Sequence, residues 1–236
     1  MNRAFPQPFC RAGAPGRFHC KTLNSREFGW IATISKPRFR TRHQSKSMGR
    51  ADQEPALSEH YFAIFDTSIG RCGIAWGPRG INAVQLPMGS EEKTRARIRQ
   101  RYADAAEAPP PAGVQRAIEG IVELLQGKPN DLSDVVLDLG GVPEFHRGVY
   151  DIARTIPPGK TMTYGDIAKR LGGVELSRDV GQALGRNPCP IVVPCHRVLA
   201  AGGKPGGFSA NGGVVTKLKM LAIEGADVNH TPSLFD

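Results

Sequence analysis

One short segment of the chain brings together residue types that can do covalent chemistry. Residues 191–198 read IVVPCHRV, so Cys195 is followed directly by His196 and Arg197. A thiolate is the nucleophilic form of cysteine, and a neighbouring base or positive charge makes it available near neutral pH. The pattern predicts a nucleophilic cysteine. An isolated Cys-His pair, by contrast, is more often a buried cysteine beside a structural histidine.

Two short helices are predicted directly before this segment. Thr163 and Asp166 fit a capping box that opens a helix over 164–171, which a pair of glycines ends. Ser177 is the predicted cap of a second helix over 178–186, which an Asn-Pro pair ends. Two such helices joined by a tight turn form a helix-turn-helix, whose second helix usually enters a DNA groove. Helix pairs of this kind also occur in domains that bind no DNA.

The helix-turn-helix belongs to the second of two predicted domains, which spans 143–226. That domain opens with an amphipathic helix over 145–156, in which Phe145, Val149 and Ile152 share one side. Two prolines and a glycine follow this helix and end it. With 236 residues, two modest domains are expected rather than one large core.

The first domain is predicted over 51–142 and begins with β-rich sequence. Three short runs separated by Gly-containing turns indicate an antiparallel meander, and they cover 61–66, 72–76 and 81–86. Ser90 is a predicted N-cap for a helix over 91–102, which has acids in its first turn and arginines later. Its arginines are interpreted as a solvated helix face rather than as phosphate contacts. A second helix over 114–126 and a short strand over 135–139 complete this domain.

Positive charge is distributed unevenly along the chain. The net charge is +9, and residues 1–50 alone hold 11 Lys and Arg against one acid. Residues 51–142 have a net charge of −4, residues 143–226 have +5, and the tail 227–236 has −2. A basic second domain favours an acidic partner such as nucleic acid.

The basic segment 1–50 shows neither strand nor helix periodicity, and we expect it to be disordered. It is interpreted as an upstream extension with a working start at Met48, with a DNA-binding arm or an organelle transit peptide as alternatives. Five cysteines, an odd number, and no apolar leader predict a reduced intracellular protein. We expect it in the bacterial cytoplasm, associated with the nucleoid when it acts. Cys10 and the pair His19/Cys20 fit no common zinc spacing. No apolar run is long enough to cross a membrane.

The sequence around the cysteine resembles one known family. The segment PCHRV, with NPCPIVV before it and GGFSANGG after it, is similar to the O6-alkylguanine-DNA alkyltransferases, also called methylated-DNA-protein-cysteine methyltransferases. The resemblance covers roughly 143–226. It implies an α+β fold, with a ribonuclease-H-like N-terminal α/β domain. A mainly helical, winged-helix-like helix-turn-helix domain follows and carries the active-site cysteine.

The resemblance implies a catalytic role for five residues. Cys195 would accept the alkyl group by direct displacement, and His196, linked through water to Glu224, would take the thiol proton. Tyr164 would offer its hydroxyl to the guanine as the leaving oxygen gains charge. Asn187 matches the hinge residue before the active-site segment.

The resemblance also implies a set of residues that contact DNA. Arg178 would fill the gap left by an extruded base, and Ser209 would contact the target oxygen. In full, the predicted DNA-binding residues are Ser177, Arg178, Arg197, Ser209 and Lys217. Phe208 stands where the family has Tyr, and the loop SANGG is about two residues longer than usual, which leaves the shape of the base pocket open. His146 replaces a common Gln.

The function implied is direct-reversal DNA repair. The chain would transfer the O6-alkyl group of guanine, and the methyl group of O4-methylthymine, from double-stranded DNA to Cys195, once per molecule. It would act as a monomer, with no cofactor, no metal and no membrane. The alternatives are a non-catalytic sensor of alkylated DNA, a helix-turn-helix transcription regulator and a multiple-turnover thiol hydrolase, which would need an oxyanion hole facing the sulfur.

Overall fold

The computed structural model describes residues 59–226. The predictions on the arm 1–50, the start at Met48, the cysteines Cys10 and Cys20 and the tail 227–236 lie outside the described residues.

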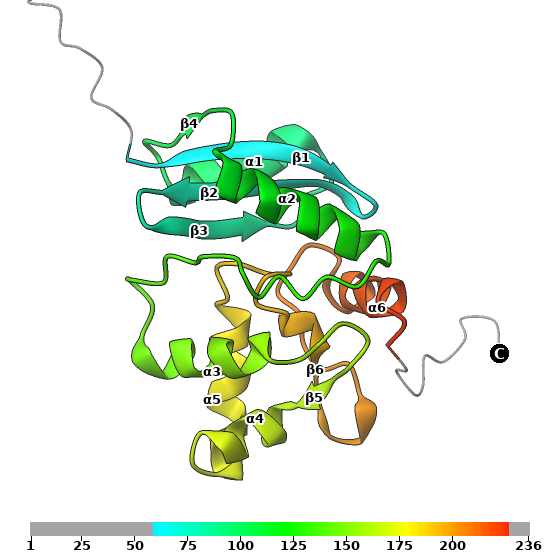
Figure 1. Cartoon of the computed structure of the whole chain (residues 1–236). Coiled ribbons are helices and arrows are strands. Elements are labelled where there is room, and N and C mark those ends of the chain that lie inside the picture. The colour runs from blue at the N-terminus through cyan, green and yellow to red at the C-terminus, as the bar shows by residue number, and fades with distance from the viewer. Residues whose placement is uncertain (1–58, 227–236) are drawn as a thin grey trace, which may run out of the picture. The chain divides into compact units, whose positions relative to one another are not determined.

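The first part of the described chain is a four-stranded sheet (Figure 1). Strands β1 (Tyr61–Thr67), β2 (Gly70–Gly77) and β3 (Gly80–Gln85) pair antiparallel in sequence order, which confirms the predicted meander. Gly70 and Gly80 begin the second and third strands with φ of +122° and +135°, a region that favours glycine. A two-residue strand, β4 (Ala106–Glu107), lies parallel to β1, so the order is β3-β2-β1-β4.

A helix covers each face of this sheet (Figure 1). Helix α1 (Glu91–Arg101) is capped by Ser90, whose side chain accepts a hydrogen bond from the backbone N–H of Lys93, as predicted. Its Ile98 packs with Phe62 and alanines of the sheet in a small cluster of their own. Helix α2 (Ala112–Leu125) covers the opposite face, and Gly127, with φ of +84°, follows its end. Alternate residues of the central strand therefore serve two different cores.

The predicted strand over 135–139 is reduced to a single bridge between Leu137 and Ile81 of β3. Two hydrogen bonds make it, from Ile81 N to Val136 O at 3.0 Å and from Asp138 N to Ile81 O at 2.8 Å. The segment is held to the helical part instead, because Arg154 donates to three carbonyl oxygens between residues 132 and 135. The prediction of a regular strand here is wrong.

The second part of the described chain is mainly helical. Helix α3 (Glu144–Arg154) packs on α5 (Ser177–Gly185), and the buried Tyr150 hydroxyl donates to Ala183 O at 2.8 Å. Helix α4 (Tyr164–Arg170) begins with the predicted capping box, in which both Thr163 and Asp166 bonds are present. Helices α4 and α5 contact each other across a short turn, as a helix-turn-helix requires.

The start of α5 differs from the prediction. A 3₁₀ turn, Val174–Leu176, runs directly into the helix, and Leu176 is its N-cap. The Ser177 hydroxyl bonds back to the carbonyl oxygen of Val174 and caps no N–H of α5. Ser177 is the first residue of the helix rather than its cap, because the preceding turn already has helical geometry.

After α5 the chain passes through irregular structure that carries the candidate nucleophile. A 3₁₀ turn, Cys195–Arg197, leads into β6 (Val198–Leu199), which pairs parallel with β5 (Met162–Thr163). A second 3₁₀ turn, Ala201–Gly203, precedes α6 (Gly213–Ile223). One continuous apolar cluster runs from β2 and β3 through α2 and α3 to this segment, so the sheet and the helical part share a core.

Candidate active site

The backbone around Cys195 is held in an unusual conformation. Ile191 has φ of +77°, which is costly for a β-branched residue and persists only where its surroundings enforce it. Asn187 supplies part of that enforcement: its side-chain amide donates to Val193 O at 2.8 Å, and its side-chain oxygen accepts from Cys189 N at 2.9 Å. Asn187 thus closes the loop that delivers the cysteine, which is compatible with its predicted place at a hinge.

The Cys195 side chain lies at the base of an open cavity. Cys195 is 8% exposed, whereas the neighbouring His196 is fully buried. The cavity has a volume of about 490 Å³ and, besides Cys195, is lined by Tyr164, Ser177, Gly181, Leu184, Gly185, Gly207, Phe208 and Ser209. These residues come from α4, α5 and the loop after β6, so elements far apart in sequence build one pocket over the sulfur. We refer to this cavity as the base pocket.

A buried polar network lies behind the cysteine. His196 Nε2 is 2.8 Å from Glu224 Oε1, and Arg197 donates to both oxygens of the same carboxylate at 2.8 and 2.9 Å. Arg197 also donates to Ile156 O at 2.6 Å. The prediction that a water bridges His196 and Glu224 is therefore wrong, because the two side chains form a direct hydrogen bond.

The charges of this network follow from its partners. Burial alone would raise the pKa of Glu224, but the hydrogen bonds from His196 and Arg197 outweigh it and hold that pKa at about 2. Burial lowers the pKa of His196 despite the opposing effect of Glu224, so the imidazole is neutral at neutral pH. A neutral imidazole facing a carboxylate places its one proton on Nε2. The other nitrogen, Nδ1, is then an acceptor, and among residues 59–226 it is buried with no hydrogen-bond partner.

The thiol itself is not ionised by its surroundings alone. Burial raises the pKa of Cys195, while the Asn187 side chain and the Lys217 ammonium act in the opposite direction. A cysteine in this state needs a base to remove its proton before it can attack.

Tyr164 forms one wall of the base pocket, at the start of α4. Burial raises the pKa of its hydroxyl, which therefore keeps its proton and can donate a hydrogen bond. Gly206, with φ of +67°, lies so close that a Cβ there would come within 3.0 Å of the Tyr164 ring. This glycine is required both by the backbone conformation and by the tyrosine.

Residues 144–226 match the family described as "6-O-methylguanine DNA methyltransferase, DNA binding domain". A methylated-DNA-protein-cysteine methyltransferase of Methanothermobacter thermautotrophicus is 36% identical over 66% of this chain and 80% of that protein. One from Mycobacterium bovis is 38% identical over 75% of this chain and 99% of that protein. The chain belongs to the methylated-DNA-protein-cysteine methyltransferase family.

A solved structure agrees with this membership. The crystal structure of Mycobacterium tuberculosis OGT in complex with DNA is 29% identical, covers 70% of this chain and 92% of that one, and has a TM-score of 0.54. The α/β sheet followed by helices is therefore the fold of this methyltransferase family, as the resemblance in the sequence implied.

Two residues that were predicted to bind DNA in this methyltransferase are buried in the structure. Arg197 is 2% exposed, and its donors are used by Glu224 and Ile156. Lys217 is fully buried on α6, donates to Val198 O at 2.6 Å and lies 5.8 Å from the centre of the Tyr164 ring. Burial lowers the pKa of Lys217 to about 8. The prediction that these two cations contact DNA is wrong, because both have internal partners and are almost fully buried.

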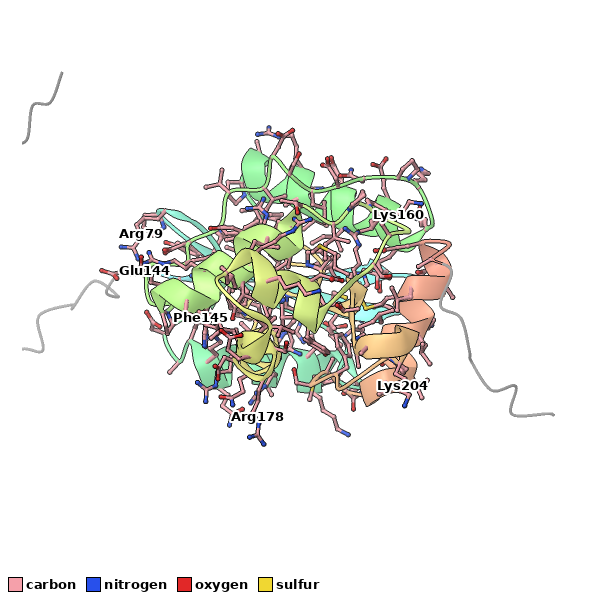
Figure 2. The ribbon with its side chains drawn as sticks, turned by 90° about the horizontal axis from the view of Figure 1, so that it is seen from below. Arg79, Glu144, Phe145, Lys160, Arg178 and Lys204 are labelled. Carbon is pink, nitrogen blue, oxygen red and sulfur yellow. The ribbon has the colours of Figure 1, made fainter. Side chains whose placement is uncertain are left out.

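The remaining predicted DNA contacts lie at the surface. Arg178 is exposed near the start of α5, and Figure 2 shows its side chain extending outward from the molecule. Ser177 and Ser209 line the base pocket, and the Ser209 hydroxyl donates to Gly185 O at 3.1 Å. The structure brings these serines together with Cys195 and Tyr164, while Arg178 stays outside the pocket.

Some functional features were not predicted from the sequence. The sequence did not predict that Arg197 bonds both oxygens of Glu224, although an arginine directly after a candidate histidine is a signal for a charge partner. Nothing in the sequence indicated that Gly206 packs on Tyr164. Within residues 59–226, no group of three or more His, Cys, Asp and Glu side chains is arranged to hold a metal ion. None of the helices in that range combines the length and apolar character needed to cross a bilayer.

Proposed function

We propose that the chain repairs DNA by moving the alkyl group of O6-alkylguanine onto Cys195. The observation that carries this proposal is the position of Cys195. It lines the base pocket and directly precedes His196, which belongs to the buried network with Arg197 and Glu224. O4-methylthymine, which presents a similar alkoxy group, is a second substrate. Double-stranded DNA is the partner, and the chain acts as a monomer in the bacterial cytoplasm.

The proton of the thiol leaves toward His196. Nδ1 of His196 is the acceptor, because Nε2 carries the proton that Glu224 accepts. Among residues 59–226 no hydrogen bond joins the Cys195 thiol to the His196 imidazole, and in this proposal a bridging water carries the proton between them. The resulting imidazolium is stabilised by the ionised Glu224, which Arg197 holds in place.

The thiolate then displaces the base from the alkyl carbon. A new S–C bond forms, the C–O6 bond breaks, and its electron pair goes to the guanine, which leaves as a normal base after protonation. Tyr164 donates a hydrogen bond to the ring as charge develops, so it stabilises the transition state more than the ground state. The thioether product is stable to hydrolysis, and each molecule therefore acts once.

The target base must leave the helix to reach the sulfur. An intact duplex hides O6 from a side chain, and extrusion costs a few kcal/mol of stacking and pairing. In this proposal Arg178 occupies the gap and offsets that cost, which its exposed position near the start of α5 supports. Ser177 and Ser209 border the pocket that would receive the base, and Asn187 keeps the cysteine loop closed behind it.

The finer architecture is also part of the proposal. A ribonuclease-H-like domain over 51–142 is supported by the sheet order β3-β2-β1-β4 with a parallel fourth strand. A winged-helix-like domain over 143–226 is supported by the α4 and α5 pair beside the two-stranded β5 and β6 sheet. Residues 1–47 are dispensable in this proposal, so a chain that begins at Met48 should still transfer the alkyl group.

One measurement tests the transfer. The chain is incubated with a duplex containing a single O6-methylguanine, and its intact mass is recorded. We expect one gain of about 14 Da per chain, located on Cys195 by peptide mapping and absent from Cys195→Ala. A sensor or a transcription regulator would bind the duplex with no gain in mass, and a thiol hydrolase would release product repeatedly. Any of those results would reject the proposal.

A further inference from the structure

A second, larger cavity adjoins the base pocket on the side of the sheet. Its volume is about 1110 Å³, and it lies between α1 and the segment that follows α5. The two cavities share five lining residues, which are Leu184, Gly185, Cys195, Phe208 and Ser209. The surface is therefore continuous from the base pocket across the end of α5 to α1. We refer to the second cavity as the α1 groove.

The lining of the α1 groove is basic. Four cations contribute to it and no Asp or Glu does; the cations are Lys93, Arg97 and Arg101 of α1, and Arg186 after α5. The three on α1 are spaced four residues apart, so they form one stripe along the helix. A stripe of one sign with no counter-charge creates a positive potential along the groove.

The other arginines of α1 behave differently. Arg95 forms ion pairs with Glu91 and Glu107. Arg99 lies over the Phe62 ring, with 5.4 Å between its guanidinium carbon and the ring centre. Neither residue lines the groove. Arg101 also lies over a ring, that of Tyr102 at 5.6 Å, but unlike Arg95 and Arg99 it lines the groove.

The groove cations have no acidic partners. Between residues 59 and 226, none of the four forms an ion pair, and all four are exposed. Arg97 donates to the Gln100 side chain of its own helix. Their charge is available to an anion that enters the groove.

We infer that the α1 groove binds the phosphodiester backbone of the lesion-bearing duplex, beyond the base pair that is opened at the base pocket. This inference rests on the proposed function and extends its DNA surface from the helix-turn-helix to the first domain. Two observations identify the occupant. The groove is continuous with the pocket that contains Cys195, and α1 lies on the same side of the molecule as the outward-pointing Arg178 (Figure 2).

Phosphate contacts have a measurable signature. Each phosphate that a cation neutralises releases counterions and steepens the dependence of log affinity on log salt by about 0.9. A lesion-centred duplex that ends close to the opened pair offers no phosphates to α1. One extended by about a helical turn on each side offers them along the groove.

The experiment compares matched arginines of the same helix on two duplexes. Arg97→Gln removes a groove cation, and Arg99→Gln removes the same charge outside the groove. We expect Arg97→Gln to lower the affinity for the long duplex and to make its salt dependence shallower by about one unit. The combined variant of Lys93→Gln, Arg97→Gln and Arg101→Gln should lose about 2 to 3 units. Arg99→Gln should match the parent protein, and all variants should bind the short duplex alike.

Three results would overturn the inference. Equal behaviour of Arg97→Gln and Arg99→Gln on the long duplex removes the groove as a DNA site. An equal loss on both duplexes means that the cations act near the lesion and not on flanking DNA. A larger loss on single-stranded DNA than on the long duplex assigns the groove to a separate strand.

The proposed function is tested separately in the same samples. Methyl transfer on the short duplex, read by intact mass, should be equal in all variants, because the groove cations take no part in the chemistry. Absence of transfer in the parent protein would reject the proposed function and not the groove. If Arg97→Gln fails to fold, Lys93→Gln on the same stripe provides the measurement.

Discussion

Cations inside the active site and cations on the DNA-facing side have the same charge but opposite environments. Arg197 and Lys217 are buried, and each donates to oxygens of the protein. Arg178 and Arg97 are exposed and form no ion pair among residues 59–226. The interior pair fixes a carboxylate and a backbone turn, whereas the exterior pair can exchange water and counterions for phosphate. Burial and partners, rather than residue type, separate cations that hold the structure from cations that an anion can reach.

The strongest test of the interior network changes its base. His196→Gln keeps a side chain that can donate to Glu224 but cannot accept a proton. We expect the single-turnover rate of methyl transfer to fall by about 100-fold or more, since general-base catalysis contributes that much. Affinity for the lesion duplex should be retained, because His196 is buried and lies outside the base-pocket lining.

His146→Gln is the matched control, a half-buried histidine on α3 that lines neither cavity. Its transfer rate should equal that of the parent protein. If His196→Gln transferred the methyl group within a few-fold of the parent rate, the proton route through the imidazole would be wrong.

The next largest effect concerns the buried arginine. Arg197→Met leaves the Glu224 carboxylate buried without its bidentate partner, and breaking a buried pair costs about 3 to 5 kcal/mol. The free energy of unfolding, measured in urea, should fall by that amount. Lys128→Met removes a cation whose ion pair with Glu123 is exposed, and it should cost less than about 1 kcal/mol. Similar losses in the two variants would show that the buried network contributes little to stability.

Local signals in the sequence were read correctly, because the residues that cause them are neighbours. The bonds of the Thr163 and Asp166 capping box span three residues, and so does the Ser90 cap of α1. The meander of β1, β2 and β3 follows from alternating apolar residues and short Gly turns. Cys195 could be predicted to line a pocket because a cysteine beside a histidine and an arginine is chemically distinctive, and its role as the nucleophile stays a prediction.

Features that depend on distant partners could not be predicted from residue patterns alone. Glu224 is 28 residues from His196, and only the family resemblance joined them. Lys217 was predicted to meet DNA, but its Nζ is taken up by Val198 O, 19 residues away. One local prediction was also wrong: Ser177 does not cap α5, because the 3₁₀ turn directly before it already has helical geometry. The α1 cations Lys93, Arg97 and Arg101 are exposed, as the predicted solvated face requires, but the cavity that they line arises from packing and could not be predicted from the sequence.

A test of the exterior set addresses Arg178. Arg178→Ala removes the side chain proposed to fill the gap, and we expect duplex transfer to slow by about tenfold or more, because base extrusion costs a few kcal/mol. Transfer from single-stranded DNA, which has less stacking to overcome, should slow much less. Arg170→Ala, an exposed arginine at the end of α4, is the control and should change both rates little. An equal slowing on single strands and duplexes would show that Arg178 only contacts phosphate.

The smallest predicted effect is a pH dependence of stability that belongs to the interior. The folded-state pKa of His196 is lowered by burial, so below about pH 6.5 the unfolded chain binds a proton that the folded chain does not. Stability should therefore fall as the pH drops from 6.5, by at most about 1.4 kcal/mol per pH unit. Glu224, whose pKa is held at about 2, adds a second loss only as the pH falls below its unfolded value of about 4.3. Urea unfolding between pH 5 and 8 should show the first loss in the parent protein and not in His196→Gln. Parallel curves of stability against pH would contradict the prediction, because they would mean that folding does not lower the pKa of His196.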